Sequence, residues 1–206
     1  MSTKQAHDHK KPVSKDNRKS GMVAVDTETL GLKVTRDRLC VCQVSDGEGN
    51  VWLVQFDGTD WSAPNLKKIL ADASLTKLFH FGRFDIAVLE HYLGVKTAPV
   101  FCTKIASKLT RTYTDRHGLK DLVAELLDIQ LDKQQQTSFW AAEELSEAQQ
   151  YYAASDVLHL HALHDKLVER LKMHGRKDYA DACFAFLPTR ATLDIEGFGG
   201  LNIFAH

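Results

Sequence analysis

The sequence predicts an α/β protein in which helices cover a central mixed sheet and the C-terminal half is helical. Three observations predict this fold class. Short apolar runs rich in β-branched residues, typical of strands, occur at 22–25, 39–44 and 51–56. Strand and helix patterns alternate over 64–93, and from 147 onward apolar residues recur at helical steps of three or four. The 206 residues, 44% of them hydrophobic, suffice for one compact domain.

Composition and charge narrow the possible classes of protein. No apolar run is long enough for a membrane helix and the N-terminus lacks a signal-peptide core, so we expect a soluble cytoplasmic protein. The four cysteines include no Cys-x-x-Cys pair, which favours free buried thiols. The formal net charge of -1 offers no overall attraction for a long nucleic acid. Residues 1–20 carry six Lys or Arg against two acids, and we expect a disordered basic tail.

The first strand ends in a pair of acids. The uncharged run 22–25 leads into Asp26-Thr27-Glu28 and then into the turn glycine Gly31. If the backbone stays extended through Thr27, both carboxylates project to the same side. Like charges this close raise each other's pKa unless a cation neutralises them, so the pair indicates a divalent metal. The alternative is an ordinary acidic turn after a strand, because Asp is a common turn former.

The next elements follow the same patterns. A turn signal at 46–50 joins the runs 39–44 and 51–56 into a hairpin, and the first strand extends it to a meander. Residues 65–71 have helical spacing, and 77–81 form another short strand. Helical patterns then dominate to the C-terminus.

A further carboxylate of interest is Asp85. Its helical partners at plus three, four and seven are Val88, Leu89 and Tyr92, which places its side chain on the apolar stripe of a helix. A carboxylate there is costly unless it is paired, hydrogen-bonded or near a cation. The alternative is an acid at a helix N-terminus, stabilised by the helix dipole.

Asp156 repeats this situation. A capping box at 146–149 opens a predicted long helix, on which Tyr152 lies one turn before Asp156 on the same face. That face continues through Leu160, Leu163, Leu167 and Leu171. Three histidines that follow Asp156 lack the i, i+4 spacing of a helical metal pair, and we interpret them as incidental.

Four such carboxylates are compatible with folding if they converge around dications. Oxygen ligands without a His or Cys cluster favour magnesium or manganese over zinc. Two such ions, about 4 Å apart, stabilise the attacking and leaving oxygens of a phosphoryl displacement. A tyrosine hydroxyl can orient the attacking water. The residues alone therefore indicate metal-assisted phosphodiester chemistry.

These motifs resemble a known superfamily. Asp26-Thr27-Glu28, Asp85 and Tyr152-x-x-x-Asp156 are similar to the three motifs of the DEDD 3′-to-5′ exonucleases, in the branch with tyrosine in its third motif. The chain resembles ribonuclease D over 101–110, 117–120 and 152–156.

A closer resemblance is to the nano-RNase C family, the short oligoribonucleases of alphaproteobacteria. The segments that carry it are 79–85, 110–117, 186–190 and 203–206. We therefore predict one 3′-to-5′ exonuclease domain over 21–206. One departure is Phe139 before Trp140, where the family usually has an acid.

The resemblance implies a ribonuclease H-like exonuclease fold and two divalent ions, Mg²⁺ or Mn²⁺. Asp26, Glu28 and Asp156 would hold one metal, and Asp26 would bridge to the second. Asp85 would support the second metal directly or through water, and Tyr152 would position the nucleophilic water. These five residues are the predicted catalytic set.

The substrate-binding residues are predicted from two sources. Five Lys or Arg and one His between Lys104 and Lys120, against the single acid Asp115, make the best candidate for a phosphate clamp. Leu30 resembles the wedge that the family inserts between two bases, and core packing is the alternative. The full predicted set is Thr27, Leu30, His80, Lys108, Arg111, Tyr113, Arg116, His117 and Lys120.

A near-neutral protein with one basic patch suits a short substrate with few phosphates. We therefore predict an exoribonuclease acting on very short RNA, especially dinucleotides. The alternatives are trimming of longer RNA or single-stranded DNA 3′ ends, as in ribonuclease D, and a catalytically inactive nucleic-acid-binding module.

The C-terminal segment predicts assembly. After a helix expected to end near Pro188, the chain carries Phe198, Leu201, Ile203 and Phe204, an unusually apolar terminus. Such side chains must be buried against the chain's own domain or against a partner. The resemblance implies a closed ring of eight subunits, so we predict a homo-oligomer.

Overall fold

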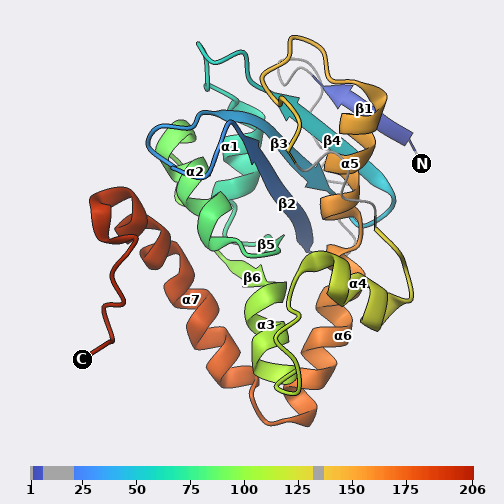
Figure 1. Ribbon diagram of the computed structural model, residues 1–206, viewed down its shortest axis with the longest axis vertical. Helices are drawn as coiled ribbons and strands as arrows, with labels where there is room; N and C mark the ends of the chain where they lie inside the picture. The colour runs from blue at the N-terminus through green and yellow to red at the C-terminus, as the bar shows by residue number, and fades with distance from the viewer. Residues whose placement is uncertain (1, 7–20, 132–136) are drawn as a thin grey trace.

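The computed structural model describes residues 2–6, 21–131 and 137–206. Its centre is a six-stranded mixed sheet with the strand order β1-β4-β3-β2-β5-β6 (Figure 1). The strands are β1 (Ser2–Ala6), β2 (Met22–Thr29), β3 (Leu39–Ser45), β4 (Asn50–Gln55), β5 (Thr76–Phe79) and β6 (Val100–Cys102). This confirms the predicted mixed sheet and the meander formed by β2, β3 and β4.

Helices surround the sheet and make up most of the C-terminal half, as predicted (Figure 1). They are α1 (Pro64–Ala71), α2 (Arg83–Leu93), α3 (Thr103–Thr110), α4 (Leu119–Leu127), α5 (Glu147–Leu158), α6 (Leu160–Met173) and α7 (Lys177–Leu193). α5 packs against β2, β3 and β4, whereas α2 packs against β2 and β3 and also against α7. No helix in the described ranges is long and apolar enough to span a bilayer.

The register of β2 decides where the acids lie. β2 runs antiparallel to β3, with Asp26 opposite Gln43 and Glu28 opposite Val41, and the register shifts between Glu28 and Thr29. β2 also runs parallel to β5, which in turn runs parallel to β6. The carboxyl ends of these three strands therefore meet at one edge of the sheet. Asp26 and Glu28 lie in the half of β2 that approaches this edge.

The structure differs from the sequence prediction at three places in the fold. Ser2–Ala6 form a strand paired with β4, within the range 1–20 predicted to be a disordered tail, of which the rest lies outside the described residues. The single long helix predicted from 147 is interrupted at His159, which ends α5 and precedes α6. No Gly or Pro marks this break, so periodicity alone gave no signal of it.

The third difference is at Pro188, which lies inside α7. Pro removes one helical hydrogen bond. Here α7 continues to Leu193 because it is packed against α2 and β6. The expectation that all cysteines are buried is wrong for Cys183, which is exposed on the same helix, whereas Cys40, Cys42 and Cys102 are buried.

The C-terminal segment follows α7 through a short π-helical turn, η2 (Asp194–Phe198). Arg83 on α2 holds it with a two-pronged ion pair to Asp194 (2.5 and 2.7 Å) and a hydrogen bond to the Gly199 carbonyl (2.8 Å). Arg190 donates to the same Gly199 carbonyl and to those of Phe198 and Leu201. The backbone here is therefore docked on its own domain by arginines.

Candidate active site

Three of the predicted acids form one cluster. Asp26 and Glu28 are two residues apart on β2, so their side chains leave the same face of the sheet. Asp156 reaches them from α5, and one carboxylate oxygen of each residue lies within 4.8 Å of the other two. All three are half-buried. This arrangement supports the metal interpretation over an ordinary acidic turn.

Asp85 approaches from the other side of β2. It lies in the first turn of α2 and is only 4% exposed. Thr27 points to the face opposite Asp26 and Glu28, and its hydroxyl donates to Asp85 Oδ1 at 2.6 Å. Thr27, predicted to contact substrate, thus has its hydroxyl committed to orienting Asp85.

The electrostatics of the cluster favour a bound cation. Burial raises the pKa of Asp26 and of Glu28 well above their usual ranges, and the neighbouring carboxylates raise them further. Burial also raises the pKa of Asp85 to about 7, although the Thr27 hydrogen bond opposes this shift. Mg²⁺ and Mn²⁺ prefer oxygen ligands, and a bound dication would relieve the repulsion among these carboxylates. The residues present therefore fit a divalent metal.

Gln43 is a member of the site that the sequence analysis missed. It is fully buried on β3, and its Nε2 donates to Glu28 Oε1 (3.2 Å) and Asp26 Oδ2 (3.4 Å). The signal that could have found it is its polar side chain in the otherwise apolar run 39–44. Its position opposite Asp26 could not be known without the strand register.

Tyr152 stands one helical turn before Asp156 on α5. Burial raises the pKa of its hydroxyl, and a hydrogen bond to Asp156 and the nearby carboxylates add to the effect. The hydroxyl therefore stays protonated and can donate. Its ring packs against Trp140, with the ring centroids 5.9 Å apart, and the predicted capping box at Ser146 is present. These contacts fix Tyr152 beside the acids.

The other predicted substrate-binding residues are distributed as follows. Leu30 directly follows β2 and is 46% exposed, so it is available as a wedge and is not part of the core. His80 lies between β5 and α2, and its Nδ1 is 2.9 Å from Thr103 Oγ1. Because that hydroxyl also bonds the Phe79 carbonyl (3.2 Å), His80 is fixed by its contact with α3.

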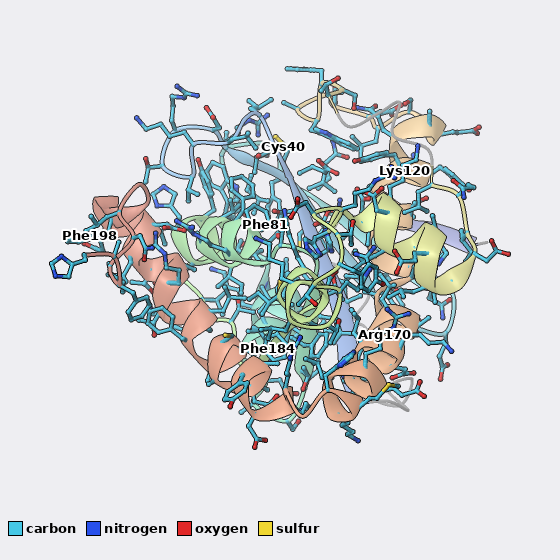
Figure 2. The ribbon with its side chains drawn as sticks, turned by 60° about the horizontal axis from the view of Figure 1, so that its bottom comes forward. Cys40, Phe81, Lys120, Arg170, Phe184 and Phe198 are labelled. Atoms are coloured by element: carbon cyan, nitrogen blue, oxygen red, sulfur yellow. The ribbon has the colours of Figure 1, made fainter. Side chains whose placement is uncertain are left out.

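Part of the basic stretch faces solvent. Lys108, Arg116 and Lys120 are exposed, and Figure 2 shows Lys120 on α4. His117 lies between them and is half-buried, with its Nδ1 2.8 Å from Ser107 Oγ. Burial lowers the pKa of His117. These groups have the exposure that a phosphate-binding surface needs.

Arg111 does not fit its predicted role. It is 1% exposed, forms an ion pair with Glu125 through Nε and Nη2, and donates from Nη1 to Ser107 Oγ (3.0 Å) and the Arg116 carbonyl (2.7 Å). It therefore holds the loop between α3 and α4. The Tyr113 hydroxyl likewise donates to Glu125. The sequence could not indicate this, because Glu125 lies fourteen residues beyond Arg111.

Comparison with known proteins decides the family. Residues 3–172 match the family model described as 3′-5′ exonuclease. The chain belongs to this 3′-5′ exonuclease family. Together with the acid cluster, this membership makes it a nuclease that hydrolyses phosphodiester bonds with divalent metal ions.

Relatives of this exonuclease include both ribonuclease D and NrnC proteins. It is 33% identical to Gluconacetobacter diazotrophicus ribonuclease D over 175 residues, which are 85% of this chain and 44% of that protein. It thus spans less than half the length of the curated ribonuclease D relatives. Escherichia coli RNase D has a similar structure (28% identity, TM-score 0.77, 93% of this chain and 51% of that chain).

The similarity to NrnC is more extensive. A structure of Brucella melitensis NrnC bound to pGG is 55% identical, has a TM-score of 0.91 and covers 99% of this chain and 96% of that chain. Another structure of the same protein, with bound Mg²⁺, is 54% identical and has a TM-score of 0.90. The ribonuclease H-like exonuclease fold is thereby confirmed. The predicted divalent cofactor agrees with the acid cluster of this chain and with its family.

The raised pKa values predict how stability depends on pH. Between the ordinary pKa of an unfolded Asp, about 4, and the value of about 7 for folded Asp85, the folded protein holds a proton that the unfolded chain has released. This contribution to the free energy of unfolding therefore falls as pH rises across that interval. Asp26 and Glu28 act with the same sign. Thermal melts in EDTA and in magnesium, at pH 5 and pH 7.5, will measure it.

We expect magnesium to raise the melting temperature more at pH 7.5 than at pH 5, because the metal binds the ionised carboxylates. The variant Asp26→Asn serves as the control, because groups that titrate elsewhere in the chain affect the melting temperatures of variant and wild type equally. In EDTA, the melting temperature of Asp26→Asn should exceed that of wild type, and the difference should be larger at pH 7.5 than at pH 5. A difference that shrinks with pH would contradict the electrostatic description of the cluster.

Proposed function

We propose that this exonuclease degrades very short RNA, especially 5′-phosphorylated diribonucleotides, to nucleoside 5′-monophosphates. The observation that carries the proposal is the 55% identity with B. melitensis NrnC, whose structure bound to pGG matches nearly the whole of both chains. We place the enzyme in the cytoplasm, where short RNA is produced.

The proposed roles are those that the family resemblance implies, and the cluster of Asp26, Glu28 and Asp156 supports them. Asp26, Glu28 and Asp156 would hold one divalent ion. Asp26 would also hold the second, which Asp85 would support directly or through water. The bound ions would supply electrostatic stabilisation of the attacking and leaving oxygens. Tyr152, kept protonated, would orient the water whose oxygen forms the new bond to phosphorus. The bond from phosphorus to the 3′-oxygen of the preceding nucleotide breaks, the water gives up a proton, and the leaving oxygen takes one up as a hydroxyl. The released nucleotide keeps its 5′-phosphate.

A cleavage assay separates this proposal from that of an inactive binding module. A 5′-labelled, 5′-phosphorylated diribonucleotide is incubated with the enzyme in magnesium, in manganese and in EDTA. We expect labelled nucleoside 5′-monophosphate with either metal and none with EDTA. Binding without cleavage under all three conditions would support the inactive module.

A second candidate is trimming of longer RNA or single-stranded DNA 3′ ends. The identity with ribonuclease D proteins favours it. Against it, the basic surface available for a longer backbone is small, because Arg111 is buried. Affinity for RNA that rises steadily with RNA length would favour this second candidate function.

The proposed phosphate clamp predicts a preference for a 5′-phosphate. Lys120→Ala and Lys108→Ala should each weaken binding of the phosphorylated dinucleotide by about tenfold, because a charge-assisted hydrogen bond to phosphate contributes about 1.5–3 kcal/mol. Binding of the 5′-hydroxyl dinucleotide should change little. Isothermal titration in calcium, with Lys68→Ala on α1 as the control, measures both. Equal losses for the two dinucleotides would remove these lysines from the clamp.

We also propose that the protein is a homo-oligomer, with eight subunits as the family resemblance implies. Although arginines hold the backbone of the C-terminal segment, Phe198 (46% exposed), Leu201 (54%) and Phe204 (78%) are left at the surface. Figure 2 shows Phe198 at the outer edge of the molecule. Exposed apolar groups on an ordered segment are typical of subunit contacts.

Truncation after Arg190 should therefore reduce the assembly to smaller species. Light scattering on the full-length and truncated chains measures this. A full-length monomer of about 23 kDa would contradict the assembly. An unchanged oligomer after truncation would place the contact elsewhere.

A further inference from the structure

Gln43 donates hydrogen bonds to two acids of the site, and these bonds are not needed for the pairing of the strands. β3 is buried along its whole length, and Gln43 is its fully buried side chain opposite Asp26. The amide Nε2 donates to Glu28 Oε1 and Asp26 Oδ2 at 3.2 and 3.4 Å. One neutral group thus spans both acids of β2.

The other end of the same amide is unsatisfied. Gln43 Oε1 is buried and has no hydrogen-bond partner among the described residues. A buried acceptor without a partner costs free energy, and an apolar side chain would fill the same place without that cost. A glutamine at this position is therefore explained by what its Nε2 donates to. That target is the pair of carboxylates.

A neutral donor is well suited to a metal-binding pair. A Lys or Arg in this place would bring a positive charge that competes with the dication for the same carboxylates. The amide instead satisfies one oxygen of each carboxylate, fixes the rotation of both groups and adds no charge. Hydrogen bonds to ligating carboxylates commonly orient them for the metal.

We propose that Gln43 is a positioning residue that holds Asp26 and Glu28 in the arrangement that binds the divalent ion. This inference rests on the metal site of the proposed function. Gln43 acts through the two acids and does not touch substrate. Gln43 would thus add to the metal site one residue from β3, the strand beside β2.

Gln55 provides a matched control. It also lies on a strand of the sheet, and its Oε1 is likewise buried without a partner in the described part of the chain. Its Nε2, however, donates to the Ala142 and Glu143 carbonyls (2.6 and 3.2 Å) and not to the acids. Gln55→Met therefore removes an amide of the same kind without touching the cluster.

The test is calorimetric titration of Mn²⁺ into metal-free wild type, Gln43→Met and Gln55→Met. We expect Gln43→Met to weaken Mn²⁺ binding by about 10–100-fold, the usual loss when a group that orients a metal ligand is removed. Gln55→Met should stay close to wild type. Mn²⁺ affinity of Gln43→Met equal to that of Gln55→Met would overturn the inference.

Two further measurements keep the test decisive. If Gln43→Met does not fold, Gln43→Asn replaces it, because it retains an amide but withdraws it by one methylene. Gln43→Asn should also weaken Mn²⁺ binding. Wild-type Mn²⁺ affinity in Gln43→Asn would count against the proposal. Activity of the variant should be recovered by raising magnesium. Because magnesium also stabilises the fold, thermal melts in EDTA are needed to show that the variant is not merely destabilised. Because the titration uses no RNA, it stands even if the enzyme fails to cleave dinucleotides, which would refute only the proposed function.

Discussion

Asp26→Asn is expected to abolish RNA turnover and leave the fold intact. Asp26 belongs to the three-carboxylate cluster and directly precedes Thr27, whose hydroxyl donates to Asp85. Loss of its charge should lower the rate by on the order of 10³-fold or more, because the charge that holds the metals supplies most of the transition-state stabilisation in such a site. The metal-free protein should become more stable, since one repelling buried carboxylate is removed.

Single-turnover rates on a dinucleotide and thermal melts in EDTA measure the two effects. Glu28→Gln and Asp156→Asn should behave like Asp26→Asn, whereas Asp165→Asn, an exposed acid on α6, should retain wild-type activity. A rate for Asp26→Asn within about tenfold of wild type would remove the cluster from the chemistry.

Tyr152→Phe should slow the chemical step by on the order of 10²-fold and leave metal binding unchanged. The Tyr152 hydroxyl is protonated and donates a hydrogen bond to Asp156. Its loss therefore removes a hydrogen-bond donor and no charge. The ring contact with Trp140 is retained by phenylalanine, which makes this a test of the hydroxyl alone.

Single-turnover rates and Mn²⁺ titration on the same preparation distinguish the two roles open to Tyr152. A slower rate with wild-type Mn²⁺ affinity is the expected result. An unchanged rate would show that the water is oriented by another group, and weakened Mn²⁺ binding would show that Tyr152 acts by positioning Asp156.

The parts of the site that lie on one element could be predicted from the sequence. Asp26 and Glu28 are two residues apart on a strand, and Tyr152 and Asp156 are one turn apart on a helix, so backbone periodicity alone places each pair on one face. The same periodicity put Asp85 on the buried side of α2, where it is found. The meander and the helical C-terminal half followed from similar patterns.

The contacts between elements could not be predicted in this way. Gln43 meets the acids only through the register of β2 with β3, and Arg111 is buried because Glu125 comes from the following helix. Charge and residue type made Arg111 look like a phosphate ligand, since Arg is usually exposed. The continuation of α7 through Pro188 likewise reflects packing against other elements, which overrides the local preference of proline.

Cleavage of dinucleotides in preference to longer RNA can be measured as the dependence of rate on RNA length. Single-turnover rates are measured on 5′-phosphorylated, 5′-labelled RNA of two to about ten nucleotides, at matched concentration in magnesium. The proposed wedge at Leu30 and the proposed clamp around Lys120 would together suit a two-base substrate, so we predict that the dinucleotide is cleaved fastest, by on the order of tenfold or more over longer RNA. Rates that are equal across the series, or that rise with length, would contradict a preference for dinucleotides.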